Sequence, residues 1–184
     1  MNDEPLGLAD CEALGNGWLA QPAGAVSSLA FLVAAVFAGL ALRRAPGHTA
    51  GTAWLAVGLL AAIGVGSFDY HGWQSAAALW LHDGPIALLL ALLALTLGER
   101  LWRRHYFFLA ATRGRVVTLL VLLLIGGIAY LLGRTGSAGC DPNSWWQWHA
   151  LWHTIIAVVL GLVIVMIWGG PIPPEPEDSP ESDQ

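Results

Sequence analysis

Residues 145–168, WWQWHALWHTIIAVVLGLVIVMIW, decide the fold of this chain. The stretch has 24 residues with no Asp, Glu, Lys or Arg, and about 20 apolar residues suffice for a helix to cross a bilayer. His149 and His153 are four residues apart, so on a helix their imidazoles share one face. Histidines are costly inside a membrane and mark a functional site by default. Two facing imidazoles would supply two of the three protein ligands of a catalytic zinc site.

The composition places the rest of the chain in a membrane as well. Of the 184 residues, 56% are hydrophobic and 11% are charged, whereas soluble domains carry about 25% charged residues. No basic patch with interleaved aromatic residues occurs, which argues against nucleic-acid binding. The abundance of Ala, Gly, Leu and Trp is typical of a GC-rich bacterial genome, so we expect a bacterial inner (plasma) membrane.

The hydrophobic pattern predicts an all-α fold, a polytopic bundle of five transmembrane helices in one domain, residues 1–170. The expected spans are 23–42, 52–70, 75–97, 116–132 and 145–168. The acidic N-terminal segment lacks the basic start of a signal peptide. Residues 171–184, PIPPEPEDSPESDQ, predict a disordered acidic tail because they have almost nothing to bury.

The arginines predict which way the bundle faces. Five spans place seven of the eight basic residues on one side of the membrane and Arg134 alone on the other. Because cytoplasmic loops carry the excess of basic residues, we expect the N-terminus outside and the tail in the cytoplasm. The seven are Arg43, Arg44, Arg100, Arg103, Arg104, Arg113 and Arg115.

This topology brings polar residues from three spans to the outer face. The second span ends there, and the third and fifth begin there, so His71, Asp83, His149 and His153 should lie at similar depth. Ser67 lies one helical turn from His71 on the same face. We therefore expect a metal site formed by the three histidines, with Ser67 and Asp83 beside it.

Pro85 adds a reason to expect a polar cavity near Asp83. A proline at this position cannot bond the carbonyl of Leu81, so the helix is expected to kink or open there. Exposed backbone is tolerated in a membrane where it lines a cavity. His82 is rotated by about 100° from Asp83 on a helix, so it need not face the same cavity. His82 is therefore only a candidate to contact the metal ligands rather than the metal itself.

The ordered set of motifs resembles the alkaline ceramidase family and, more broadly, the membrane hydrolases that include the adiponectin and progestin receptors. That superfamily carries S-x3-H at the end of one span, Asp at the start of the next and H-x3-H on the last. The matching residues here are Ser67, His71, Asp83, His149 and His153. The N-terminal segment is also similar, with Asp10-Cys11-Glu12 before Gln21-Pro22 and Ser27-Ser28.

The resemblance covers residues 10 to about 168, and two features depart from it. The family has seven spans, whereas this chain has room for five. The family's glutamate at the entry to the first span looks replaced by Gln21. The resemblance implies Zn²⁺ bound by the three histidines and a Cys11–Cys140 disulfide. It also implies Ca²⁺ at the acidic segment, with Asp10, Glu12 and Asn16 as the candidate ligands, and the loss of charge at Gln21 would weaken its binding.

The resemblance also implies a function, an intramembrane zinc-dependent amide hydrolase of a ceramide-like N-acyl lipid. Asp83 would act as general base on the metal-activated water, and Ser67 would stabilise the oxyanion. Two alternatives stay open, a zinc-containing lipid receptor or sensor without turnover, and a membrane haem protein. For Ser67, the alternative to a catalytic role is a hydrogen bond to its own helix backbone. For Cys11 and Cys140, the alternative to a disulfide is two free thiols. His48 and His105 are interpreted as loop residues outside the site. The sequence gives no indication of the oligomeric state.

Overall fold

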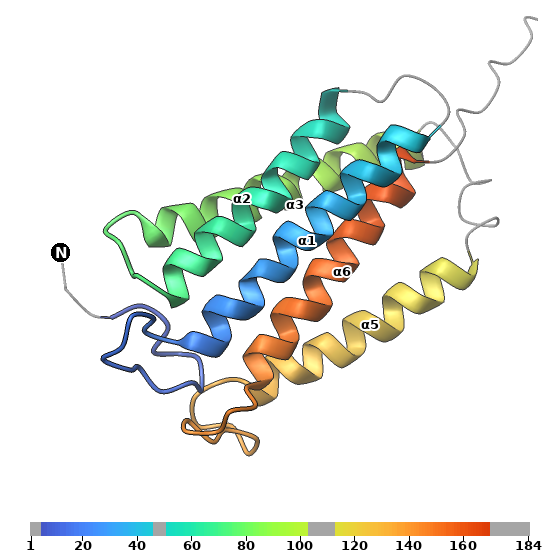
Figure 1. Cartoon of the computed structure of the whole chain (residues 1–184). Coiled ribbons are helices and arrows are strands. Elements are labelled where there is room, and N and C mark those ends of the chain that lie inside the picture. Colours follow the sequence, from blue (N-terminus) through green and yellow to red (C-terminus); the bar gives the residue numbers. More distant parts are fainter. Residues whose placement is uncertain (1–4, 46–50, 103–112, 170–184) are drawn as a thin grey trace, which may run out of the picture.

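The structure, a computed structural model, describes residues 5–45, 51–102 and 113–169. They form helices α1 (Pro22–Arg44), α2 (Gly51–His71), α3 (Ala78–Trp102), α5 (Arg113–Leu132) and α6 (Trp148–Trp168) (Figure 1). All five are long and apolar enough to cross a membrane, so the predicted all-α integral membrane fold with five spans is confirmed. The predicted tail, His48 and His105 lie outside the described residues.

The helix ends differ from the predicted spans by a few residues. The last helix begins at Trp148 rather than at residue 145, because Gln147 has extended backbone angles (φ −110°, ψ 124°). α3 continues through Pro85 without interruption, so the predicted opening of this helix does not occur. α2 runs to His71 and includes the whole S-x3-H motif.

α1 lies at the centre of the bundle, between α2 and α6, while α3 packs outside α2 and α5 packs outside α6. Both α1 and α2 bury small residues, among them Ala35, Ala38, Ala53 and Ala56, which allow close approach of helices in a membrane. Among the described residues, α3 and α5 do not pack against each other. Figure 1 shows α5 separating from α6 toward its start.

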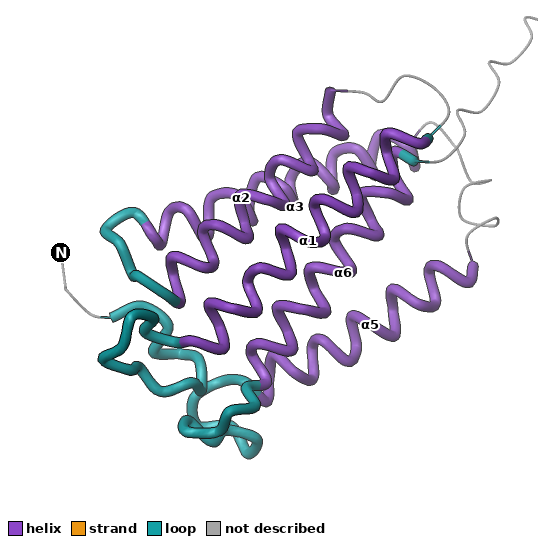
Figure 2. The backbone as a smooth tube through the Cα atoms, in the orientation of Figure 1, coloured by secondary structure: helices purple, strands orange, loops and turns teal. Residues whose placement is uncertain are grey.

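The loops that hold the site gather at one end of the bundle (Figure 2). We call this the disulfide end; it comprises residues 5–21, 72–77 and 133–147. Cys11 and Cys140 are bonded, with their Cα atoms 5.4 Å apart, which confirms the pairing that the resemblance implied. The backbone of Cys11 also donates to the carbonyl of Gly133 at 2.8 Å. The N-terminal segment is therefore fixed onto the connection between α5 and α6.

Glu12 ties the same segment to the start of α1. Its two carboxylate oxygens accept hydrogen bonds from the backbone N–H groups of Ala23 and Gly24, at 2.7 and 2.8 Å. These N–H groups have no partner within a helix, and a carboxylate suits the positive end of the helix dipole. Burial raises the pKa of Glu12, and the two backbone hydrogen bonds oppose that rise. Pro22 follows at the first turn, where its missing N–H costs nothing.

Candidate metal centre

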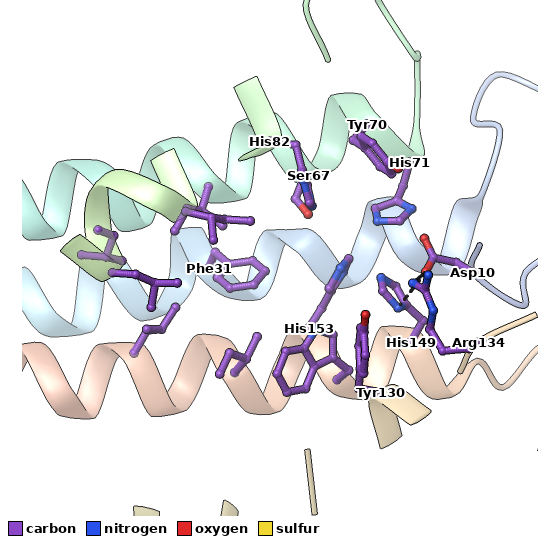
Figure 3. A pocket seen from close by; sticks show the side chains of 17 residues that line it. Asp10, Phe31, Ser67, Tyr70, His71, His82, Tyr130, Arg134, His149 and His153 are labelled. Atoms are coloured by element: carbon purple, nitrogen blue, oxygen red, sulfur yellow. Dashed lines mark hydrogen bonds and ion pairs between the residues drawn. The ribbon is translucent and has the colours of Figure 1, made fainter. Parts of the chain in front are cut away.

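The three predicted histidine ligands converge inside the bundle (Figure 3). His71 on α2 and His149 and His153 on α6 are all buried, and each offers one nitrogen within 4.8 Å of those of the others. The ring centroids are 5.2 Å apart for His71 and His149, 5.0 Å for His71 and His153, and 4.5 Å for the pair on α6. This arrangement could hold a metal ion, as the topology argument predicted.

Gln21 determines which nitrogen of His71 is free. The amide nitrogen of Gln21 donates to the carbonyl oxygens of Gly7 and Glu12, at 3.0 and 2.9 Å, which leaves its oxygen facing His71. That oxygen lies 2.8 Å from Nδ1 of His71 and can only accept, so Nδ1 carries the proton. Nε2 of His71 is then unprotonated and has a free lone pair, as a metal ligand requires.

His153 is oriented in the same way by the start of α1. Its Nδ1 lies 3.0 Å from the hydroxyl oxygen of Ser27 and 3.3 Å from the carbonyl oxygen of Gly24. The hydroxyls of Ser27 and Ser28 donate to this same carbonyl, so their oxygens are left to accept. Nδ1 of His153 is therefore the donor, and its Nε2 is the free nitrogen. Such partners behind a metal ligand fix the ring and its tautomer.

His149 has a carboxylate beside it. Nδ1 of His149 lies 3.3 Å from Oδ1 of Asp10, without the angle of a hydrogen bond. The same oxygen accepts a hydrogen bond from Nη1 of Arg134 at 2.7 Å. Burial raises the pKa of Asp10, and the neighbouring Arg134 opposes that rise. Asp10 thus links a candidate ligand on α6 to the only cation in the three loop segments of the disulfide end.

Two buried nitrogens point to a missing partner. Nε2 of His71 and Nδ1 of His149 have no hydrogen bond, although buried polar atoms almost always have one. A metal ion would satisfy Nε2 of His71 directly. Within the described ranges, these histidines form the only group of three or more His, Cys, Asp or Glu side chains with converging ligand atoms. The carboxylates of Asp10 and Glu12 do not form such a group, so the expected Ca²⁺ site stays a prediction.

The histidines line one end of a cavity of about 420 Å³ inside the bundle. Polar side chains surround this end, and the deeper part lies among apolar side chains, as Figure 3 shows. The apolar lining residues are Phe31, Ile63, Ile86, Leu89, Leu90, Trp152, Ile156 and Leu160. The cavity lining is therefore polar at one end and apolar at the other, which is the pattern that complements an amphipathic lipid.

The structure brings Ser67 to the cavity but not Asp83. Ser67 is buried and lines the cavity on the same helix as His71. The side chain of Asp83 is 63% exposed and lies outside the lining. His82 takes the inward position, with its ring 6.3 Å from that of His71, and its Nδ1 lies 2.7 Å from Oδ1 of Asp83. Asp83 thus reaches the cavity only through His82.

Four polar lining residues have no role in the zinc site that the sequence predicted. Asp10 and Arg134 come from loops, Tyr70 stacks on His82 at 4.5 Å, and Tyr130 lies under the guanidinium group of Arg134 at 5.2 Å. One signal was present for Arg134, because the predicted topology leaves it as the only arginine on its side of the membrane. Asp10 adjoins Cys11, which the disulfide places beside residue 140.

A comparison of the chain with models of known protein families, with curated proteins and with solved structures finds no match.

Proposed function

We propose that this protein is an intramembrane zinc-dependent amide hydrolase that releases a fatty acid from an N-acyl lipid. The observation that carries the proposal is the position of the three buried histidines, at the polar end of a cavity whose other end is apolar. The motif order, which resembles that of the alkaline ceramidases, supports the same chemistry. The similarity of this chain to the alkaline ceramidases rests on these motifs alone.

The donor set suits zinc. Neutral imidazoles are common zinc ligands, and three protein ligands leave the fourth position open for water. A bound zinc ion would supply a Lewis acid and a water whose pKa falls to about 7. The three rings lie within 5.2 Å of one another, which fits one ion better than the wide plane of a haem. The geometry therefore favours a metal ion over the haem alternative.

The cavity suggests how the substrate is oriented. An acyl chain would lie along Phe31, Leu89 and Leu160, where burial of each CH₂ contributes about 0.8 kcal/mol. This would place the amide carbonyl beside the three histidines and the amine side toward the disulfide end. In the reaction, the water oxygen bonds to the carbonyl carbon, the C–N bond breaks, and the amine leaves with a proton. The products are a fatty acid and a free amine.

Ser67 and the His82–Asp83 pair would assist this chemistry. Ser67 lines the cavity, and in this proposal its hydroxyl donates to the developing oxyanion. His82 lines the cavity, and its Nδ1 lies 2.7 Å from Oδ1 of Asp83, so we propose that His82 carries the proton from water to the leaving amine. In this proposal Asp83, the base predicted from the sequence, acts as a positioning residue for His82.

We place the site near the outer face of a bacterial plasma membrane. The excess of arginines at the opposite end supports this orientation, and so does the disulfide, because disulfides persist in oxidising compartments. A reporter active only outside the cytoplasm, fused after Gln184, should be silent. Strong reporter activity would mean that the orientation is inverted.

The decisive experiment measures fatty acid release. Zinc-loaded protein in detergent or liposomes is given a panel of N-acyl and O-acyl lipids, with His149→Ala as the inactive control. We expect release from N-acyl lipids by the wild type alone, and its loss on chelation. Release from no lipid at all by a protein that still binds zinc would overturn the hydrolase and favour the lipid sensor.

A further inference from the structure

Arg134 is the one lining residue with a permanent positive charge. It follows α5, and its guanidinium group lies over the ring of Tyr130 at 5.2 Å, which fixes its direction. Within the part of the chain that the structure describes, this group donates one hydrogen bond, from Nη1 to Asp10. A guanidinium group has five N–H donors, so most of them remain for a ligand.

The charge balance of the polar end favours an anion. Asp10 and Arg134 are the only two lining residues with full charges, and they offset each other. A bound dication would then leave the polar end positive, and the ion is usually the largest local charge in such a site. A neutral headgroup would offer Arg134 only neutral acceptors, whereas an anionic group forms charge-assisted hydrogen bonds with a guanidinium group that are roughly twice as strong.

The position of Arg134 also limits where the anion can lie. One Asp10 oxygen is 2.7 Å from Nη1 of Arg134 and 3.3 Å from Nδ1 of His149. The guanidinium group is therefore separated from a candidate metal ligand by a single carboxylate oxygen. A substrate with its carbonyl at the histidines would reach Arg134 with a group only a few bonds beyond the amide nitrogen.

We infer that the substrate carries an anionic group close to its amide nitrogen, and that Arg134 binds this anion. This inference rests on the proposed function, and it narrows the substrate class to N-acyl lipids with a carboxylate or phosphate headgroup, of which an N-acyl amino acid is the simplest. A planar fork of donors pairs well with such anions. Hydrolysis of an N-acyl amino acid consumes one water and gives a fatty acid and a free amino acid.

The test uses two substrates with the same acyl chain, N-oleoylglycine, which is anionic, and N-oleoylethanolamine, which is neutral. The measured quantity is the ratio of their kcat/KM values with zinc-loaded protein. Arg134→Gln should lower this ratio roughly tenfold to a hundredfold, and Arg134→Lys should retain part of it. N-oleoyl phosphoethanolamine tests the phosphate; greater dependence on Arg134 for this lipid would identify phosphate as the anion.

Asp10→Asn separates recognition from a structural role of the Asp10–Arg134 pair. Like Arg134→Gln, it breaks the ion pair, but it removes the negative charge and keeps the positive one. It should therefore raise the ratio of kcat/KM for N-oleoylglycine to kcat/KM for N-oleoylethanolamine. If the pair only holds the two loops together, both variants will lower kcat/KM for both lipids alike. An unchanged ratio in both variants would overturn the inference.

Binding distinguishes this inference from the proposed function. Tritiated N-oleoylglycine should bind zinc-loaded wild type more tightly than tritiated N-oleoylethanolamine, and Arg134→Gln should remove the difference. If that preference is found but no lipid is cleaved, the anion site stands and only the hydrolase fails. Equal binding of the two lipids by the wild type would reject the anion site whether or not turnover occurs.

Discussion

The carbonyl oxygen of Leu81 on α3 occupies the position that a β-carbon on Gly66 of α2 would take. Pro85 has no N–H, so this carbonyl lacks its usual partner four residues on in the helix. α3 nevertheless continues past Pro85, and the Leu81 carbonyl lies against a residue without a side chain. The two helix backbones therefore meet where Ser67 and His82 turn toward the cavity.

Gly66→Ala should therefore destabilise the protein. The new methyl group would overlap the backbone of Leu81 and lie 2.8 Å from the backbone nitrogen of His82, and a backbone cannot move aside as a side chain can. Overpacking of this kind costs about 1–3 kcal/mol. The control is Gly58→Ala on the same helix, where a β-carbon meets nothing within 4 Å. Thermal denaturation in detergent, followed by size-exclusion chromatography, should show a lower Tm for Gly66→Ala only.

This contact also shows why the sequence predicted some of the site and not the rest. The three histidines follow from span ends and helical spacing, which depend on the sequence locally. The choice between His82 and Asp83 depends on how α3 is rotated against α2, and that rotation is set by a backbone contact across two helices. Asp10 and Arg134 lie in loops without periodicity, so their meeting required the disulfide and the loop hydrogen bonds.

The metal prediction is that purified protein binds one zinc ion per chain. His71→Ala, His149→Ala and His153→Ala should each lower the stoichiometry, because each removes one of the three converging nitrogens. His82→Ala should keep its zinc, since His82 lines the cavity but does not belong to that group. Elemental analysis of protein purified without added metal measures this. Unchanged zinc in His149→Ala or His153→Ala would contradict the ligand assignment.

A substitution at Gln21 should weaken zinc binding without abolishing it. Gln21→Leu removes the acceptor that holds Nδ1 of His71 but leaves all three ligands in place. Loss of a partner behind a ligand typically costs about tenfold to a hundredfold in metal affinity. Competition with a chelator should show weaker binding at full stoichiometry. An affinity equal to that of the wild type would mean that Gln21 does not orient His71.

The disulfide should matter for stability because it closes a long loop. Cys11 and Cys140 are 129 residues apart in the sequence. The double variant Cys11→Ser/Cys140→Ser should lose about 2–5 kcal/mol of stability, the usual effect of removing a native disulfide. Denaturation of the variant is compared with that of wild type, with and without reductant. Mass analysis that recovers both cysteines of the wild type as free thiols would exclude the bond.

The final prediction concerns Ser67 and His82, which line the cavity with the three histidines, and Asp83, which contacts His82. Ser67→Ala should lower turnover by roughly 10²–10³ if its hydroxyl is a main oxyanion donor. His82→Ala should lower it by roughly 10²–10⁴, the usual contribution of a positioned acid–base group. Zinc content should stay at the wild-type level in both, because neither residue is among the converging histidines. The assay is fatty acid release from the N-acyl lipid that the wild type cleaves best.

Asp83→Asn decides between two roles for this carboxylate. If Asp83 acts only by holding Nδ1 of His82, the double variant His82→Ala/Asp83→Asn should be no slower than His82→Ala alone, because residues that act as a unit are not additive. If Asp83 is itself the base, as the sequence predicted, the second substitution will slow the enzyme further. Loss of zinc from Asp83→Asn would contradict both roles, since it would show that the carboxylate supports the metal.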